Sequence, residues 1–581
     1  MGKVSALSLQ PGDQILLRRG DTFRGTLFVR QSGTADRPVI IDAYRSGSKP
    51  IVAGSVPVSN WTNVGNNTWQ AGCSGCGDQV TGVYRNGAIL PLGRYPNLSD
   101  ANRGYLTIQS HSGTTQLTSQ QSLPIDWTGG EVVFRARQWI MNRASITQQS
   151  GNTLTFNNTN TYGLNDGYGF FIQNHPAALD QLGEWCYNPA NKTIRLFDNQ
   201  NDPNGQLLTA TAFGEGVNLT DASFVTVRNI QITQTLTTGL LANGGSNLTF
   251  FNNDITSSGT DGVSVSDTAS NVLAENNLIE DANNNGFSIQ FYQNFTFRGN
   301  TVRRIAVTPG RGKSGDGTYT GVLSNCSGGT LIENNVIDNI GYNGISFSNN
   351  ATIRNNHVSD FCQTKSDGAG IYTWNGLRNN ITEVRVLSNI VYNGIGAIEG
   401  TPGGYYAGAN GIFLDDCSQN AEVSGNTTFG SRGMGIFLRG ILNVNVRNNT
   451  SYNNSEEQLR LAINGRCDPL NNVVQDNILI ARNPNQIVVA YETGANNLAD
   501  YGLFDRNYYA RPFEDQFKIR ILYNPGSGLT GADLSLNEWQ TRFGQDRNSF
   551  NSPITYKLQT TNQTGASLLN HAFSGNISGW G

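Results

Sequence analysis

A short phrase recurs along the middle of this sequence and limits the folds that the chain can adopt. The phrase is a glycine followed by an apolar residue, any residue and a second apolar residue, and its glycines are Gly239, Gly262, Gly286, Gly321, Gly344, Gly370, Gly411 and Gly435. A second phrase, an asparagine followed closely by an apolar pair, occurs at Asn229, Asn253, Asn277, Asn300, Asn335, Asn356, Asn389, Asn426 and Asn449, so that the two series alternate. Self-similarity at a period of about 20 to 50 residues indicates stacked copies of one structural unit.

The length of the repeat indicates coils that are built from short strands. The shortest spacings between successive glycines are 23 and 24 residues. Each unit carries three short apolar runs and no stretch long enough for a helix, which suits one coil of three strands. The 68 glycines, with many Asn, Thr and Ser residues, also favour strands joined by tight turns. We expect the asparagine side chains to stack in one turn of the coil, each amide bonding the next, because buried turn backbone needs partners.

The order of these phrases resembles a known superfamily. Asparagine, strand, loop, glycine-led strand, turn and strand follow one another over about residues 219–480, as in the pectin-lyase-like right-handed parallel β-helices. The resemblance implies an all-β fold, a right-handed parallel β-helix with three strands per coil. It does not imply one activity, because this architecture carries lyases, hydrolases, esterases and non-catalytic fibres.

The repeat breaks near both ends of the chain, which predicts further parts. We expect the first β-helix coils at 1–58, an inserted β-rich domain at 59–205, the main helix at 206–500, an end cap at 501–562, and a linker with the truncated start of a further β-sandwich at 563–581. In the inserted domain, Gly93-Arg94-Tyr95-Pro96-Asn97 and Gly183-Glu184-Trp185 resemble stretches of β-helix proteins from polysaccharide-degrading bacteria. The opening Met1-Gly2-Lys3 starts in the middle of a pattern, so we interpret the chain as trimmed and expect an extracellular or cell-surface protein.

Charge and cysteine content argue against several classes of ligand. A net charge of −4 without a basic stripe argues against nucleic acid. No apolar run is long enough to span a membrane. Of the seven cysteines, only Cys73 and Cys76 lie close together, and this pair favours a local disulfide or two idle thiols over a redox or zinc site. We expect no metal site and no required cofactor, and the oligomeric state is not predicted.

Insertions in the repeat gather on one side of the predicted helix. The distance from an asparagine to the next glycine is 9 residues in the coils that begin at Asn253, Asn277, Asn335 and Asn426. It grows to 21, 14 and 22 residues in the coils that begin at Asn300, Asn356 and Asn389. Stacked insertions build a wall, and in solenoids such a wall commonly marks the binding face.

The glycine-led strands predict which side chains face outward. Because side chains alternate along a strand, the second and fourth residues after each glycine point away from the core. The early coils place polar residues such as Ser264 and Ser288 there, whereas the coils from Gly370 onward place Tyr372, Trp374, Phe413, Asp415, Phe437 and Arg439. Flat rings beside charged groups are what a sugar-binding groove needs.

Two stretches of the late coils provide the candidate catalytic residues. Ser366–Trp374 and Gly411–Asp416 resemble strand signatures of bacterial secreted β-helix proteins associated with polysaccharide degradation, although Ser366 and Ala369 depart from that pattern. Carboxylates are the usual catalysts of glycosidic cleavage. We therefore predict Asp367, Asp415, Asp416 and Glu399 as catalytic, from a set that also includes Asp316. The predicted substrate contacts are Tyr372, Trp374, Phe413, Arg439, Lys365 and Tyr319.

Each carboxylate also has a structural interpretation, and three functions stay open. A loop carboxylate often caps a turn, and Asp415 could simply pair with Arg439 one coil away. The favoured function is an extracellular glycoside hydrolase that degrades a polysaccharide. The alternatives are a polysaccharide lyase, which would use a base such as Arg311, Lys313 or Lys365 and Ca²⁺ held on carboxylates, and a non-catalytic adhesin or surface-fibre module.

Overall fold

The computed structural model describes residues 1–551 except 159–161, 268–269, 327, 377–382, 404–406, 464–466, 468–469 and 513–516. Strands dominate these residues, as predicted, and the α-helices among them are α1 (Gly2–Ser5) and α2 (Leu536–Phe543). The predicted start of a β-sandwich at 563–581 lies outside the described residues. Within the described part of the chain, no helix is both long enough and apolar enough to cross a membrane.

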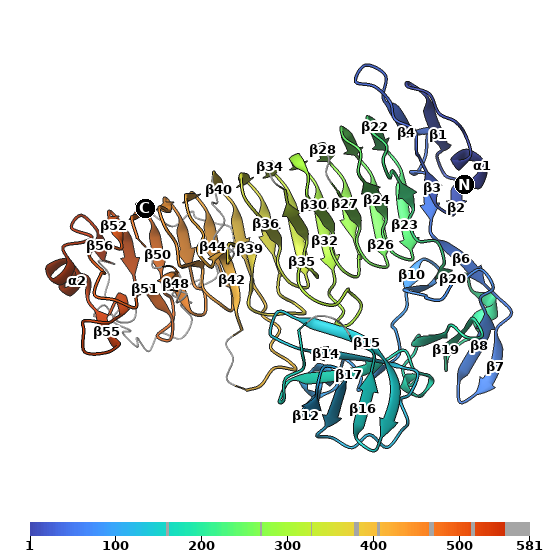
Figure 1. The fold of residues 1–581 in the computed structure, drawn as a ribbon, viewed down its shortest axis with the longest axis horizontal. Coiled ribbons are helices and arrows are strands. Elements are labelled where there is room, and N and C mark those ends of the chain that lie inside the picture. The colour runs from blue at the N-terminus through green and yellow to red at the C-terminus, as the bar shows by residue number, and fades with distance from the viewer. Residues whose placement is uncertain are drawn as a thin grey trace, which may run out of the picture.

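Three long sheets run side by side along the elongated body in Figure 1. The first contains β1 (Gln14–Arg18), β4 (Val39–Tyr44), β22 (Val225–Arg228), β25 (Leu248–Phe251), β28 (Ser270–Glu275), β31 (Gln293–Arg298), β34 (Gly328–Glu333), β37 (Ala351–Arg354), β40 (Val384–Leu387), β43 (Ala421–Ser424), β46 (Asn445–Arg447), β49 (Asn472–Gln475) and β52 (Gly502–Asp505). The second contains β2 (Thr22–Arg24), β5 (Ile51–Ala53), β23 (Gln231–Thr235), β26 (Asp254–Ser258), β29 (Leu278–Glu280), β32 (Thr301–Ile305), β35 (Val336–Ile340), β38 (His357–Ser359), β41 (Ile390–Tyr392), β44 (Thr427–Phe429), β47 (Thr450–Tyr452), β50 (Ile478–Ile480), β53 (Tyr508–Ala510) and β56 (Phe550–Asn551).

The third sheet contains the strands that begin at or near the repeating glycines. They are β3 (Leu27–Phe28), β21 (Val217–Asn218), β24 (Leu240–Asn243), β27 (Val263–Ser266), β30 (Phe287–Gln290), β33 (Val322–Asn325), β36 (Ile345–Phe347), β39 (Gly368–Trp374), β42 (Ala409–Asp415), β45 (Ile436–Arg439), β48 (Glu457–Ala462), β51 (Ile487–Glu492), β54 (Ile519–Tyr523) and β55 (Thr530–Leu534). Neighbouring strands pair in parallel, one coil apart, until β55 pairs antiparallel with β54. The predicted parallel β-helix is therefore confirmed.

Close stacking of the coils explains the repeating glycine. A Cβ atom at Gly411 would stand 2.4 Å from the carbonyl oxygen of Gly435, and one at Gly344 would stand 2.5 Å from the carbonyl oxygen of Gly370. Real Cβ atoms do not approach an oxygen so closely, so any other residue would push successive coils apart. The next residue of each strand then points inward, as Ile412 and Ile436 do, and both are fully buried in the core.

A ladder of buried asparagines runs along one turn of the coils. The side-chain amide of each rung donates to the side-chain oxygen of the next rung at 2.8 to 3.2 Å, from Asn253 to Asn449 as predicted and onward to Asn477 and Asn507. Asn229 is not a rung, and its predicted place in the series is wrong. Its amide donates to Asp42 at 2.7 Å instead, and the apolar Ile230 takes the inward position and donates its backbone N–H to Asn253.

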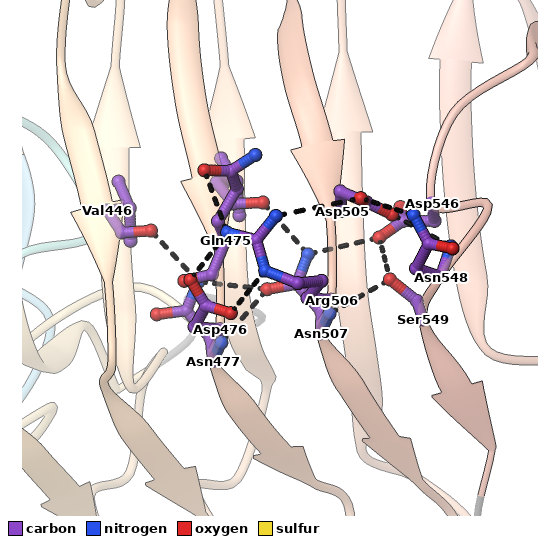
Figure 2. Close-up of polar contacts among 11 residues, drawn as sticks. Val446, Gln475, Asp476, Asn477, Asp505, Arg506, Asn507, Asp546, Asn548 and Ser549 are labelled. Atoms are coloured by element: carbon purple, nitrogen blue, oxygen red, sulfur yellow. Dashed lines mark hydrogen bonds and ion pairs between the residues drawn. The ribbon is translucent and has the colours of Figure 1, made fainter.

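The ladder ends on a buried carboxylate, as Figure 2 shows. Asn477 donates to Asn507, and Asn507 donates to Asp546 Oδ1 at 3.0 Å. The second oxygen of Asp546 accepts the indole N–H of Trp539, which lies in α2 and is fully buried. Trp539 lies within the end cap expected at 501–562, and its indole packs against Tyr491 and Phe504 of the last coils.

The predicted inserted domain is present, and its strands are antiparallel. Its sheets contain β6 (Ser55–Val58), β7 (Thr62–Gly65), β8 (Thr68–Gly72), β9 (Val83–Arg85), β10 (Ala88–Ile89), β11 (Arg94–Tyr95), β12 (Leu106–Ser112), β13 (Gln116–Ser119), β14 (Glu131–Arg135), β15 (Met141–Ser150), β16 (Thr153–Phe156), β17 (Gly169–Gln173), β18 (Trp185–Asn188), β19 (Thr193–Phe197) and β20 (Leu208–Thr211). The domain lies alongside the helix (Figure 1) and bonds the inserted loops directly. Gln173 donates to the carbonyl of Gly310, and the backbone N–H of Gly169 donates to Gly400.

Candidate active site

Three neighbouring strands of the third sheet carry most of the predicted site residues. In the register of β39 and β42, Tyr372 lies opposite Phe413 and Trp374 lies opposite Asp415. In the next pair, Phe413 of β42 lies opposite Phe437 of β45, and Arg439 ends β45. The alternation of side chains along the strand thus brings the outward residues of three coils into two adjacent rows, as the sequence predicts.

The first row is an aromatic layer that is largely covered. The Phe413 and Phe437 rings stack with centroids 4.4 Å apart, and Tyr372 meets Phe413 edge-on at 5.5 Å. Phe413 is only 2% exposed, and it belongs to a small apolar cluster with Ala369 and Met434 outside the main core. The structure therefore places Phe413 beneath the surface, where it supports its neighbours, whereas Trp374 is 47% exposed.

The second row brings together two carboxylates, one guanidinium and two ring donors. Arg439 Nη1 lies 3.4 Å from Asp415 Oδ1 and 3.3 Å from Asp416 Oδ1. Tyr372 Oη donates to Asp415 Oδ2 at 3.0 Å, and Trp374 Nε1 donates to Asp416 Oδ2 at 3.2 Å. We call these five residues, Tyr372, Trp374, Asp415, Asp416 and Arg439, the Asp415 cluster.

Asp415 is held in surroundings that favour its protonated form. Burial is the largest cause and, with repulsion from Asp416 and Asp367, raises the pKa of Asp415 to about 7 against the opposing effects of Arg439 and the Tyr372 hydrogen bond. The side chain is only 9% exposed. A carboxyl group that keeps its proton near neutral pH can act as a general acid, while the neighbouring Asp416 supplies a negative charge.

Asp367 reaches the same region although it lies at the other end of its strand. In a straight strand it would stand roughly 23 Å from Asp415, at about 3.3 Å per residue. Its left-handed backbone, with φ at 61°, turns the chain just before β39. Its charge raises the pKa of Asp415, and its backbone carbonyl accepts the hydroxyl of Tyr342 at 2.7 Å.

Tyr342 was missed by sequence reasoning, yet it lies among the acids. Burial raises the pKa of Tyr342 well above its usual value, and the charges of Asp367, Asp415 and Asp316 add to that shift. The ring is therefore within electrostatic reach of three predicted carboxylates. Tyr342 lies two residues before Gly344, and the strand alternation that identifies outward side chains begins only after each glycine.

Glu399 lies on the wall and contacts the inserted domain. The Arg135 guanidinium, on β14, donates to the backbone carbonyls of Ala397 and Glu399 at 2.9 and 2.8 Å. The Oε2 atom of Glu399 is buried and has no hydrogen-bond partner among the described residues. The structure thus brings Asp367, Asp415 and Asp416 together, and the bonds it shows for Glu399 run to the inserted domain.

Lys365 and Tyr319 lie inside the wall rather than on its surface. Lys365 is 1% exposed, its Nζ donates to Thr318 Oγ1 at 2.6 Å, and it stands 4.4 Å from the centroid of the Tyr319 ring. Burial lowers the pKa of Lys365 to about 7. Tyr319 is also buried, and its hydroxyl accepts the backbone N–H of Gly312 at 3.2 Å.

The other two bases considered for a lyase are also engaged. Arg311 is buried, where its guanidinium bonds the carbonyl of Thr81 in the inserted domain. Lys313 pairs with Asp261 at 2.5 Å. Among the described residues, no group of three or more His, Cys, Asp or Glu side chains is arranged to hold a metal ion.

Two disulfides are present in the described part of the chain. Cys73 and Cys76 are bonded, so this pair forms the local disulfide rather than two idle thiols. Cys417 is bonded to Cys467, a pairing that sequence analysis did not identify. Because Cys417 directly follows Asp416, this bond ties down the turn that carries the carboxylate. The sequence offered one signal for this bond, a cysteine directly after the two predicted carboxylates Asp415 and Asp416.

The chain is similar to one known family and to several solved structures. A family model described as "Right handed beta helix region" matches residues 191–312. A solved structure titled "Glycoside hydrolase" is 14% identical, with a TM-score of 0.55, over 76% of this chain and 88% of that one. A lacto-N-biosidase from Eubacterium ramulus is 13% identical, with a TM-score of 0.30, over 87% of this chain and 60% of that one. No curated protein matches the chain. The family model and the three parallel sheets together identify the chain as a right-handed parallel β-helix protein.

Proposed function

We propose that the protein is a polysaccharide-degrading glycoside hydrolase that cleaves its substrate across β39, β42 and β45. The observation that carries the proposal is the buried Asp415 carboxyl, whose pKa is raised to about 7 beside the negative charge of Asp416. Glycosidases need one carboxylic acid that protonates the leaving oxygen and a second carboxylate that acts as nucleophile or base. The similar solved protein titled "Glycoside hydrolase" is in keeping with this function but does not carry it.

Each member of the Asp415 cluster has a role in the proposed reaction. Asp415 donates a proton to the oxygen of the bond that breaks, and Asp416 or Asp367 supplies the second carboxylate. Arg439 touches one oxygen of Asp415 and one of Asp416, and so holds both carboxyl groups in place. The exposed ring of Trp374 offers a flat surface for a sugar, and its indole N–H steadies Asp416.

The surroundings of the candidate bases favour a hydrolase over a lyase. A lyase base must touch the substrate to remove a proton from it. Lys365 and Arg311 are buried within the wall, and Lys313 is paired with Asp261. We also infer an extracellular or cell-surface location, supported by the two disulfides, since such bonds persist mainly in oxidising compartments.

A panel of polysaccharides tests the function. Release of new reducing ends identifies a hydrolase, ultraviolet absorbance of unsaturated products identifies a lyase, and retention on the polymer without product identifies a binding module. We expect reducing ends without new absorbance. Asp415→Asn should lower turnover by roughly 10²- to 10⁴-fold, the usual contribution of a general acid.

Further variants separate the roles and control for the charge change. Comparing Asp416→Asn with Asp367→Asn shows which side chain is the second carboxylate. Only the loss of that carboxylate should lower turnover as strongly as Asp415→Asn does. Glu422→Gln is the matched control, since Glu422 lies on β43 in another sheet of the helix and is partly exposed. Full activity in all three Asp→Asn variants would refute the assignment.

A further inference from the structure

A separate hollow lies on the same sheet, farther toward the C-terminal end. It has a volume of about 400 Å³ and lies over β48, β51, β54 and β55. In the register of these strands, Arg460, Ala490 and Arg520 follow one another across the sheet. The small Ala490 side chain between two long ones leaves the space open. None of the residues that line the hollow belongs to the Asp415 cluster.

Both arginines at the rim are already paired with carboxylates. Arg460 Nη2 lies 2.8 Å from Glu492 Oε2, and its Nη1 lies 3.4 Å from Glu457 Oε1. Arg520 bonds both oxygens of Asp533, at 2.7 and 2.9 Å. The rim therefore presents two cations and three acids, so that an anionic ligand would meet a net negative charge, whereas hydroxyl groups find both donors and acceptors.

Glu457 gives independent evidence that a polar partner is missing. It is 6% exposed and lines the hollow, and its Oε2 atom has no hydrogen-bond partner among the described residues. Buried polar atoms are rarely left without a partner, because the lost hydration is not regained. Burial also raises the pKa of Glu457, because its charged form is poorly solvated there. A hydroxyl group can donate a hydrogen bond to this oxygen.

We propose that this hollow is a second carbohydrate site, which binds one neutral sugar residue. Its volume is near the lower end of ligand pockets, which suits a single ring rather than a longer chain. Ala490 and Leu522 supply an apolar floor and wall for the less polar face of the ring, and the charged rim bonds the hydroxyls. The inference rests on the proposed function only for its choice of a carbohydrate as ligand.

The position of the hollow relates it to the Asp415 cluster. Asp415 is on β42 and Ala490 is on β51, three strands farther along, which corresponds to about 14 Å at 4.8 Å per strand. The Arg460 guanidinium stands 5.7 Å from the centroid of the Phe437 ring, so the two regions adjoin. One glycan chain that follows the outer face of the sheet can therefore reach both.

Binding of monosaccharide pairs tests the charge preference directly. The probes are glucose with glucuronate and galactose with galacturonate, which differ within each pair by one carboxylate, and also mannose and xylose. NMR titration of the full chain carrying Asp415→Asn detects weak binding and needs no turnover. We expect at least one neutral sugar to bind, and its uronate partner, where the panel has one, to bind about tenfold more weakly or not at all. Binding of none of the neutral sugars, or preference for the uronates, overturns the proposal.

Variants of the hollow place the binding. Ala490→Phe fills the space and should weaken neutral-sugar binding by about tenfold or more, and Glu492→Gln, which keeps the shape, should weaken it as well. Ser264→Phe is the control, because Ser264 occupies the equivalent outward position on β27. If both hollow variants bind as the parent does, the site is elsewhere and the proposal fails. If neutral sugars bind here but no polysaccharide is cleaved by the wild-type chain, the proposed hydrolase fails and this site stands.

Discussion

Asp415 shows how surroundings decide the chemistry of one residue. The same side chain on an open strand would lose its proton at acidic pH, but here it accepts a hydrogen bond from Tyr372 and lies beside Asp416 and Arg439. Arg439 draws the carboxyl toward its charged form, whereas burial and the two neighbouring acids oppose this. The balance raises the pKa of Asp415 to about 7. A bridging arginine therefore does not make this site a simple surface ion pair.

Turnover should fall as the pH rises through about 7, because the general acid loses its proton there. Burial is the largest cause of this value, and the neighbouring groups that adjust it are Asp416, Arg439, Asp367 and Tyr372. The pH dependence of kcat/KM on a cleaved polysaccharide measures it. Asp367→Asn removes one repulsive charge and should move the alkaline limb to lower pH, while an unmoved limb would mean that another group titrates.

The stability of Asp415→Asn should depend on pH in a defined direction. Because the folded protein holds the Asp415 proton up to about pH 7 and the unfolded chain only up to about pH 4, wild-type stability falls as the pH rises through this window. The Asn side chain of the variant does not titrate, so its stability does not fall with pH in this way. We expect the variant to gain about 1 to 3 kcal/mol over the wild type at pH 8 and little at pH 4, at about 1.4 kcal/mol per pKa unit less the lost Arg439 contact.

Thermal unfolding at the two pH values measures this gain. A variant that is destabilised equally at both would show that Asp415 mainly holds the turn. The strand pattern predicted that Asp415 points away from the core, yet the side chain is only 9% exposed. Strand alternation predicted that Asp415 points outward, but it could not predict the hydrogen bond from Tyr372, because this bond joins two coils.

Among the elements, the asparagine ladder is the one that the sequence predicted most fully. The recurring phrase places eight of the predicted asparagines on adjacent coils, although the insertions vary their spacing, and each makes the same bonds. The exception, Asn229, carries the same phrase but lies in a different turn, with Ile230 at the inward position. A period alone cannot distinguish two neighbouring residues of a turn, so the first rung was misplaced by the same rule that located the others.

Removing one rung should cost much more than removing an exposed asparagine. Asn389 is fully buried, donates to Asn426 and to the carbonyl of Ile353, and accepts from Asn356. Asn389→Ala leaves buried groups without partners on both sides, and we expect a loss of roughly 2 to 4 kcal/mol. Asn445→Ala, at an exposed position of β46, is the control and should change the unfolding temperature little. Equal losses in the two variants would argue that the ladder adds nothing beyond strand packing.

At the scale of the whole molecule, the inserted domain and the inserted loops act as one wall. The sequence predicted each of them separately, from broken repeats and from long asparagine-to-glycine distances. It could not predict that they bond one another, because the contacts run from side chains of one part to backbone carbonyls of the other. Arg135 is the main example, with bonds to the carbonyls of Ala397, Glu399 and Gln138.

Arg135→Met should weaken the wall and lower the stability of the whole protein. The change leaves three carbonyl groups without their donor at a buried junction, and we expect a loss on the order of 3 kcal/mol. Arg137→Met is the matched control, because Arg137 lies two residues away and donates to its neighbour Ala136. Calorimetry compares the two. Unfolding temperatures that fall alike would mean that the junction depends on the apolar contacts alone.

The asparagine ladder also has a direction, and this bears on how the chain is made. Every rung donates to a rung that lies later in the sequence, and the last rung, Asn507, donates to Asp546 as well as to the backbone carbonyl of Val474. During synthesis the N-terminal residues emerge first, so the newest coil always carries amide groups whose acceptors have not yet been added. The ladder thus stays open at its growing end until residue 546 has left the ribosome. A chain released before that point would leave one amide hydrogen of its last rung without an acceptor, however many complete coils it contained.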